Sequence, residues 1–508
     1  MNIPNSDLDP TSGDGCELIV SLRDSSNDAS TGRRVLTEAN LPVSSLQQLA
    51  VNEHIKFLPL LMQTGKRDEI LSLPGANKSG SVTTSPLNDF FAIRPVRGEM
   101  SRKQLDVLAI KLAACPEVLA AYVKPPAFPA SLATEPPTNV RPGNPQHHKP
   151  SISGRGPALL TQSAFIASQT YLRAAPGGVD AYCAWNEAGG CGDKIRVIDI
   201  EGGWRFSHEA LKPGSVGLLV NGKTLPDWYN HGTAVLGVVG GSKGVIGIAP
   251  RCEFGGVSIF DENGGSRSAA AITNAASNLA PGDIILIELH RPGPRYGYST
   301  MTNQEGYVPI EWWYDDYFAI RQAVDSGIIV VAAAGNGGEY LDDPLYDTPP
   351  SGFPNHWTNP FRRGANDSGA ILVGAGAPPP GTNSANHGPD RSRLSFSNFG
   401  SVIDAQGWGK EVVTSGYGDL QGGADEDRWY TSRFSGTSSA APMVVGVLAC
   451  IQGIRRAAGQ PPLTPAQARN LLRTTGSSQQ DGPDQPSAKR IGTRPDLRAM
   501  IAASRSIV

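Results

Sequence analysis

The 508-residue sequence has few cysteines, a modest share of charged residues and no basic run, and each shortage removes a class of protein. Six cysteines are too few for a disulfide-dense scaffold in a chain of this length. Charged residues make up 18% and the formal net charge is −3. This composition does not predict a basic surface that could bind nucleic acid. The apolar runs are too short to cross a bilayer. We therefore expect no nucleic-acid partner and no membrane partner.

The first residues also lack the features of a secretory signal. MNIPNSDLDPTSGDG has neither a positively charged start nor an apolar stretch. This indicates a cytoplasmic protein, with secretion by another route left open.

The cysteines and histidines do not form a metal-binding pattern. No group of them has the spacing of a zinc site. Cys183 and Cys191 are near enough in sequence to pair, and two free thiols are the equal alternative. Calcium is conceivable near the acidic stretch 341–347, which lacks a defined loop spacing. We expect no cofactor.

What the chain does contain is enough apolar sequence, 39%, for more than one core. Changes in composition divide it into three parts, 1–126, 127–165 and 166–508. The first part reads as a small α+β domain. Its predicted strands are 17–23, 90–96 and 120–126, and its predicted helices are 44–54 and one capped by Ser101.

The middle part, 127–165, is rich in Pro, Ser, Asn and Gly and shows no periodicity. These features are typical of a linker. His147 and His148 lie within it, and a solvated loop is the expected setting for both.

The last part alternates apolar runs, glycine-rich turns and helical stretches. The runs at 194–200, 282–289 and 327–335 are nearly continuous, as in parallel strands covered on both faces, and 311–326 reads as a helix between two of them. We predict an α/β domain with a parallel sheet flanked by helices. In such domains, sites gather at the carboxyl ends of the strands.

A cluster of hydroxyls precedes the most apolar helix. FSGTSSAAP (434–442) leads into the run 443–451, and Pro442 suits the first turn of a helix there. Ser438 or Ser439 would then lie at a helix N-terminus, where free backbone N–H groups favour developing negative charge. The small neighbours leave room for another backbone.

Three other polar residues lie at similar positions. Asp199 ends an apolar strand, His231 enters a helix of small residues, and Asn336 stands between glycines after a strand. Taken singly, each has an ordinary structural reading. Together with Ser438 they supply a nucleophile, a base, a carboxylate that orients the base, and an oxyanion donor.

In these stretches the chain resembles the subtilisin-like serine proteases, the subtilases. The matching sequences are VIDIEGGWRFSHEAL, HGTAVLGVVGG, AAAGNGG and SGTSSAAP, in the order Asp, His, Ser. The resemblance implies that Ser438 is the nucleophile, His231 the general base, Asp199 its orienting partner and Asn336 the oxyanion-hole donor. It also implies that the first domain is an inhibitory propeptide.

The same resemblance identifies the substrate cleft and one departure from the family. The cleft walls would be formed by Glu288, Leu289 and His290 on one side and Ala332, Ala333, Ala334 and Gly335 on the other. The family usually has Ser-Leu-Gly at the first wall, so His290 takes a glycine's place. Glu288 and His290 share one face of a strand. If this face looks into the cleft, Glu288 would favour Lys or Arg near the cleaved bond. If it looks into the core, Leu289 would line an apolar pocket instead. The first alternative is preferred. His208 matches a structural family position.

The sequence thus predicts a serine endopeptidase acting on polypeptides, with its N-terminal domain as an intramolecular inhibitor. A catalytically silent module that holds peptides on the same fold remains the alternative. A third is an acid peptidase of the sedolisin type, in which glutamate replaces the histidine, and the HGT motif argues against it.

Overall fold

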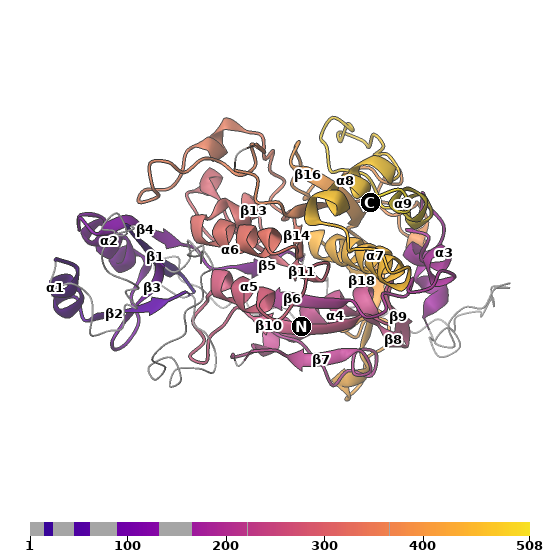
Figure 1. The fold of residues 1–508 in the computed structure, drawn as a ribbon, viewed down its shortest axis with the longest axis horizontal. Helices are drawn as coiled ribbons and strands as arrows, with labels where there is room; N and C mark the ends of the chain where they lie inside the picture. The colour runs from indigo at the N-terminus through magenta and orange to yellow at the C-terminus, as the bar shows by residue number, and fades with distance from the viewer. Residues whose placement is uncertain are drawn as a thin grey trace.

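The computed structural model, drawn in Figure 1, describes residues 15–23, 45–60, 89–131, 165–220, 222–364 and 366–507. At its centre is a seven-stranded sheet in the order β16-β15-β14-β11-β6-β10-β7, with every neighbouring pair parallel. The predicted parallel sheet is confirmed. Its strands are β6 (Arg196–Glu201), β7 (Ser215–Leu218), β10 (Glu253–Ser258), β11 (Ile284–Ile287), β14 (Ile329–Ala333), β15 (Ile371–Gly376) and β16 (Ile403–Trp408).

Helices cover both faces of this sheet. One face packs against α4 (Pro226–Gly240) and α7 (Thr437–Ala457), and the other against α5 (Ser268–Ala276) and α6 (Tyr314–Asp325). The two cores divide β6 by alternation, since Val197 faces the first and Ile198 and Ile200 face the second. Three further helices complete the first layer: α3 (Ala181–Trp185), α8 (Pro465–Thr475) and α9 (Leu497–Ser504).

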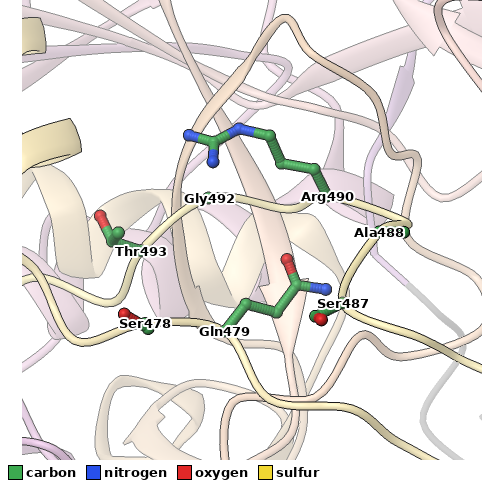
Figure 2. Close-up of a pocket in the computed structure, with 7 residues that line it drawn as sticks. All are labelled: Ser478, Gln479, Ser487, Ala488, Arg490, Gly492 and Thr493. Atoms are coloured by element: carbon green, nitrogen blue, oxygen red, sulfur yellow. The ribbon is translucent and has the colours of Figure 1, made fainter.

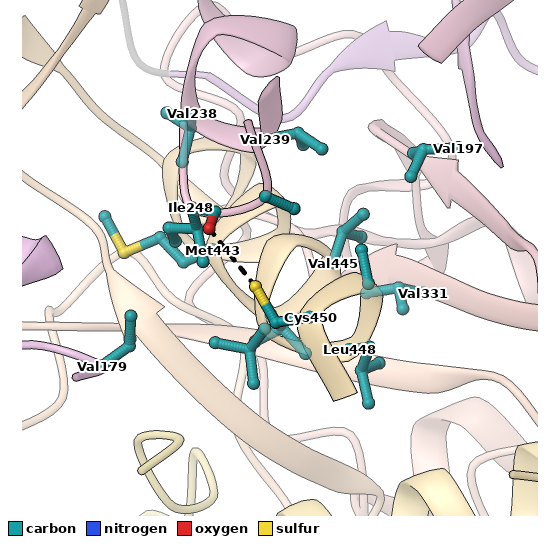
Figure 3. Packing of buried hydrophobic residues seen from close by; sticks show 14 of the residues in the cluster. Val179, Val197, Val238, Val239, Ile248, Val331, Met443, Val445, Leu448 and Cys450 are labelled. Atoms are coloured by element: carbon teal, nitrogen blue, oxygen red, sulfur yellow. Dashed lines mark hydrogen bonds between the residues drawn. The ribbon is translucent and has the colours of Figure 1, made fainter. Parts of the chain in front are cut away.

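The helix α7 forms the centre of the larger core. Figure 3 shows Met443, Val445 and Leu448 among valines of the sheet and of α4, and the Cys450 thiol donates to the Ile248 carbonyl at 3.3 Å. α7 has the length and hydropathy of a membrane span, but 94% of its most apolar window is buried inside the domain. The helix begins at Thr437, so Pro442 lies in its second turn and not in its first as predicted.

The N-terminal part forms a separate antiparallel sheet in the order β2-β3-β1-β4, seen at one end of Figure 1 beside α5 and α6. Ser101 caps α2 as predicted, and the structure shows that it forms a capping box with Gln104. The strand β2 escaped the sequence reading, because its five residues look like any short apolar run. The elements are β1 (Glu17–Leu22), α1 (Ser45–Asn52), β2 (Ile55–Pro59), β3 (Phe90–Pro95), α2 (Arg102–Ala113) and β4 (Val118–Lys124).

Small antiparallel pairings complete the fold. The one that bears on function is β13-β12-β5, in which the two-residue strand β5 (Phe128–Pro129) joins the edge of β12 (Leu289–Pro292). The start of the predicted linker is therefore an ordered strand. Most of the rest of it, His147 and His148 included, lies outside the described residues. The remaining strands are β8 (Ser242–Lys243), β9 (Val245–Ile246), β13 (Tyr307–Pro309), β17 (Val412–Ser415) and β18 (Tyr430–Phe434).

Candidate active site

The predicted catalytic side chains come together at the carboxyl edge of the central sheet. His231 lies within α4, Ser438 is the second residue of α7, and Asn336 follows β14 by three residues. All three are at most 3% exposed. Each element ends or begins at this edge because the strands are parallel.

The carboxylate that meets the histidine is not the one predicted. His231 Nδ1 lies 2.7 Å from Glu201 Oε1, whereas Asp199 Oδ2 accepts from the Trp204 indole N–H at 2.8 Å. The strand β6 runs one residue further than expected, to Glu201, so Glu201 stands at its carboxyl end and Asp199 two residues deeper. Both acids point to the same face, and the later one reaches His231. When Glu201 is ionised its carboxylate can only accept, so Nδ1 then carries the proton and Nε2 is free to take one.

The two adjacent serines differ in their partners. The Ser439 hydroxyl donates to the Trp408 carbonyl at 2.7 Å and lies 3.0 Å from the Gly436 carbonyl. In the described part of the chain, neither the Ser438 hydroxyl nor His231 Nε2 has a well-aligned hydrogen-bond partner. Ser438 is thus the serine whose hydroxyl is available for reaction.

A segment of the chain itself occupies the site. Ala130 donates its N–H to the Glu288 carbonyl at 3.1 Å, and its own carbonyl accepts from the Ser438 N–H, also at 3.1 Å. Upstream, Pro129 pairs with Leu289 and Phe128 with His290 in the β5–β12 ladder. Residues 128–131 therefore lie as an extra strand along the predicted cleft wall, a recognised way of binding an extended peptide.

Glycine is needed where this segment passes the helix start. Gly436, directly before α7, has φ +101°, and a Cβ there would lie 2.4 Å from the Ala130 carbonyl oxygen. Any side chain would push the carbonyl away from the Ser438 N–H.

Asn336 is held on both sides of its amide. Its Oδ1 accepts from the Thr437 N–H and hydroxyl at 2.9 and 3.0 Å, and its Nδ2 donates to Gln304 Oε1 at 3.0 Å. Gln304 in turn donates to the Pro129 carbonyl at 3.2 Å. Within the described residues no hydrogen bond joins Asn336 to the Ala130 carbonyl, so one amide hydrogen remains for an oxyanion. The sequence analysis missed Gln304, because it lies in an irregular loop with no motif.

The other predicted cleft residues contribute mainly backbone. Leu289 is completely buried in the second core, and Ala333 and Ala334 are likewise fully buried. Gly335, with φ +92°, donates its N–H to the Thr437 hydroxyl at 3.1 Å. In the structure the wall formed by β12 and Glu288 pairs through its backbone with residues 128–130.

The side chain of Glu288 points toward Ser438. Its carboxyl is fully buried beside the Ser438 hydroxyl. Burial raises the pKa of this carboxyl well above its usual range, and the neighbouring Asp199 and Glu201 also raise it. The Ser438 hydroxyl has the smaller, opposite effect and lowers it. Neither of its oxygens has a well-aligned hydrogen-bond partner in the described residues. The preference for Lys or Arg that Glu288 was expected to produce stays a prediction.

Burial controls the electrostatics of the whole centre. It raises the pKa of Asp199 and of Glu201 well above their ordinary values and lowers the pKa of His231 to about 4, against an opposing effect of Asp199. The pKa of His290 is lowered to about 3, first by burial and then by His231. With residues 128–131 seated, both imidazoles are neutral at ordinary pH, as a general base must be.

Other predicted positions have structural partners. His208 Nε2 lies 2.8 Å from the Trp429 carbonyl and its Nδ1 accepts from the Ala210 N–H. In the acidic stretch, Asp343 pairs with Arg295 and Asp347 with Arg362. Across the described residues no three His, Cys, Asp or Glu side chains are grouped to hold a metal. All six cysteines are free, Cys183 and Cys191 included.

A separate pocket of about 380 Å³ lies in the C-terminal loops (Figure 2). None of the predicted site residues lines it. The lining residues are Ser478, Gln479, Ser487, Ala488, Arg490, Gly492 and Thr493.

Comparison with known proteins places the chain in a family. The model of the subtilase family, Peptidase_S8, matches residues 217–492, more than half of the chain. Subtilisin of Bacillus pumilus is 28% identical over 299 residues, 58% of this chain and 88% of that protein. Thermitase of Thermoactinomyces vulgaris is 28% identical over 305 residues, 58% of this chain and 86% of that protein.

Solved structures give the same fold at lower identity. Fervidolysin from Fervidobacterium pennivorans, a keratinolytic enzyme related to subtilisin, matches with a TM-score of 0.55 at 17% identity, over 96% of this chain and 60% of that one. The epidermin leader peptide processing serine protease of Staphylococcus aureus matches at 0.51 and 16%, over 97% and 99%. The family model covers His231, Asn336 and Ser438 but begins after Glu201. By its seven-stranded parallel sheet and this match, the chain belongs to the subtilase family.

Proposed function

We propose that this protein is a serine endopeptidase in which Ser438 is the nucleophile, His231 the general base and Glu201 the group that orients His231. The Ser438 N–H and the Asn336 amide are the oxyanion donors. The observation that carries the proposal is the hydrogen bond from the Ser438 N–H to the Ala130 carbonyl, at 3.1 Å. It brings a peptide carbonyl to a helix N-terminus beside an unpartnered hydroxyl and a neutral imidazole.

The chemistry follows from these positions. His231 Nε2 takes the hydroxyl proton as Ser438 Oγ bonds to the carbonyl carbon, and negative charge develops on the carbonyl oxygen facing the two donors. The imidazolium then gives its proton to the leaving nitrogen, the C–N bond breaks, and an acyl-enzyme remains on Ser438. Water, activated by the same imidazole, hydrolyses this ester and restores the serine.

The first substrate is the chain itself. Ala130 is the residue whose carbonyl meets Ser438, so the bond to be cut is Ala130–Ser131, inside the predicted linker 127–165. The released N-terminal part, 1–130, holds the cleft with its last strand. This supports the division into a propeptide-like domain, a linker and a peptidase domain beginning near residue 166.

A buried ion cluster supports the inhibitory role of the N-terminal domain. Lys124, at the end of β4, lies 2.5 Å from Asp315 and 3.2 Å from Asp316 in the first turn of α6. Tyr122 donates to Asp315 at 2.9 Å, and Glu17 pairs with Arg291 of β12 at 2.9 Å. Every one of these side chains is at most 1% exposed. Such contacts hold the domain where its strand enters the cleft.

The test compares wild type with Ser438→Ala and Ser439→Ala in the full chain. Wild type should split into two fragments, the larger starting at Ser131 by mass spectrometry, and should label with a fluorophosphonate at Ser438. Ser438→Ala should remain intact and unlabelled, since loss of the nucleophile costs orders of magnitude in turnover. Ser439→Ala should still be cut.

Three results would contradict the proposal. Equal cleavage by Ser438→Ala would remove Ser438 from the reaction. An intact, unlabelled wild type that binds peptides would favour the silent peptide-holding module. Retention of full activity in His231→Ala would favour the sedolisin-type chemistry, in which carboxylates act without an imidazole.

A further inference from the structure

We propose that His290 fills the space in which a large side chain beside the cleaved bond would lie, so that this protein cuts after small residues, alanine foremost. The inference rests on the proposed function and names the substrate class of that same site. It comes from the occupant of the cleft and from the residues that enclose it.

The alanine at the cleaved bond has no free space around it. Ala130 is 0% exposed and belongs to the larger apolar core, although it sits at the end of a short strand. Its neighbours Pro129 and Ser131 are only partly buried. In contrast to positions 129 and 131, a longer side chain at position 130 would therefore have to displace protein atoms.

His290 lies on the same face of the ladder as Ala130. Residues paired across antiparallel strands point to the same side, so His290 shares a face with its partner Phe128. Ala130, two residues on from Phe128, points the same way. The side chains of Pro129 and Leu289 are on the opposite face.

The His290 side chain lies beside Gly335 of the other predicted cleft wall. A Cβ placed on Gly335 would lie 3.4 Å from His290 Nδ1, 3.5 Å from His290 Cβ and 2.8 Å from Asn398 Nδ2. Gly335 belongs to the wall opposite β12, so the imidazole and the Asn398 amide occupy the room between the two walls. Small residues at 333–335 would otherwise leave that room open.

The ring is also fixed in place. His290 Nδ1 accepts from the Asn336 N–H at 3.2 Å, and its ring centroid is 4.7 Å from that of Tyr307. Tyr307 in turn contacts Phe128, with centroids 5.6 Å apart. A side chain held by a hydrogen bond and an aromatic contact resists being pushed aside, so His290 acts as a fixed limit on size.

The test uses the chain's own cleavage site. Ala130→Phe should slow self-cleavage at least 100-fold relative to wild type, a loss of the size that pocket misfit produces. Adding His290→Gly to Ala130→Phe should restore at least a tenth of the wild-type rate, because the ring's space becomes available. Adding His387→Ala instead, a histidine paired with Glu411 at the surface, should restore nothing.

A second measurement does not depend on activity. In the Ser438→Ala chain, Ala130→Phe should lower Tm by about 2 °C or more, and His290→Gly should recover most of that loss. Separate peptides ending in Phe-Pro-Ala or Phe-Pro-Phe before the cleaved bond then give the ratio of kcat/KM for the cleaved enzyme. A general weakening of the oxyanion hole by His290→Gly lowers both peptides equally and leaves the ratio unchanged.

The outcomes separate the two proposals. Rapid self-cleavage of Ala130→Phe with His290 intact, an unchanged Tm, or no rescue by His290→Gly would each overturn the role of His290. If wild type is not cleaved but the Tm values follow the expected pattern, the proposed peptidase activity is wrong. The proposed packing of position 130 against His290 would still hold.

Discussion

Glu201 illustrates how one residue of strand length changes an assignment. Asp199 and Glu201 alternate onto the same face of β6, and both are completely buried. Only Glu201 hydrogen-bonds to His231, while Asp199 is satisfied by the Trp204 indole. The motif VID predicts that Asp199 contacts His231, whereas in the structure Glu201 makes that contact.

This gives a matched pair of variants. Glu201→Gln should lower kcat by about 10⁴, since an amide in place of the orienting carboxylate stabilises the wrong imidazole tautomer. Asp199→Asn should retain kcat within about tenfold, because the amide oxygen still accepts from Trp204. Steady-state kinetics of the two variants decides, and a larger loss for Asp199→Asn would return the orienting role to the aspartate.

The acid limb of the pH–rate profile should depend on whether residues 128–131 occupy the site. His231 must be neutral to accept the Ser438 proton, and burial lowers its pKa to about 4 in the intact chain. Glu201, Asp199, Glu288 and His290 are the titratable groups around it. Self-cleavage should therefore continue at pH 5. Once the segment leaves, water enters and the pKa returns toward the ordinary value of about 6.5.

Rates of self-cleavage and of peptide hydrolysis measured from pH 3 to 8 test this. The midpoint of the acid limb should be lower for self-cleavage, and a common midpoint near 6.5 would be the contrary result. The same shift makes the fold less stable as pH falls from about 6.5 to about 4, because the unfolded chain takes up the proton first.

At the scale of elements, one strand end joins the two domains. Lys124 of β4 meets Asp315 and Asp316 of α6 without exposure to water. Removing one partner of a buried ion pair leaves the other charges uncompensated, at a cost of about 3–5 kcal/mol. An exposed pair contributes about 0–1 kcal/mol.

The prediction uses the uncleavable Ser438→Ala chain. Lys124→Ala should lower the stability of the N-terminal domain's attachment by that larger amount, read as faster hydrogen exchange in β4 and a lower midpoint of denaturant unfolding. Lys111→Ala, which removes an exposed pair with Glu53, is the control and should change little. Equal effects of the two would show that the buried cluster adds nothing to docking.

At the scale of the whole molecule, the bond proposed to be cut and the proposed catalytic groups belong to one chain and already lie together. Positioning of this kind makes the reaction unimolecular. The rate constant of self-cleavage should therefore be unchanged on a hundredfold dilution, measured by the loss of full-length chain on gels. A rate that falls in proportion to concentration would mean that one molecule cuts another.

Much of the fold follows from sequence patterns alone. Continuous apolar runs predict buried parallel strands, a property of each segment by itself, and β6, β11 and β14 formed where they were expected. The capping box at Ser101 and the helical position of Ser438 are likewise local. The stretches around His231, Asn336 and Ser438 carry enough motif to be assigned without coordinates.

Tertiary structure decided the contacts that depend on distance between segments. Alternation puts Asp199 and Glu201 on one face but does not say which reaches α4, because that depends on where β6 ends against its neighbours. A linker composition does not reveal that Phe128 and Pro129 pair with β12, since two residues carry no periodicity. The size limit proposed for His290 depends on Gly335 and Tyr307, far apart in the chain, which lie beside its ring.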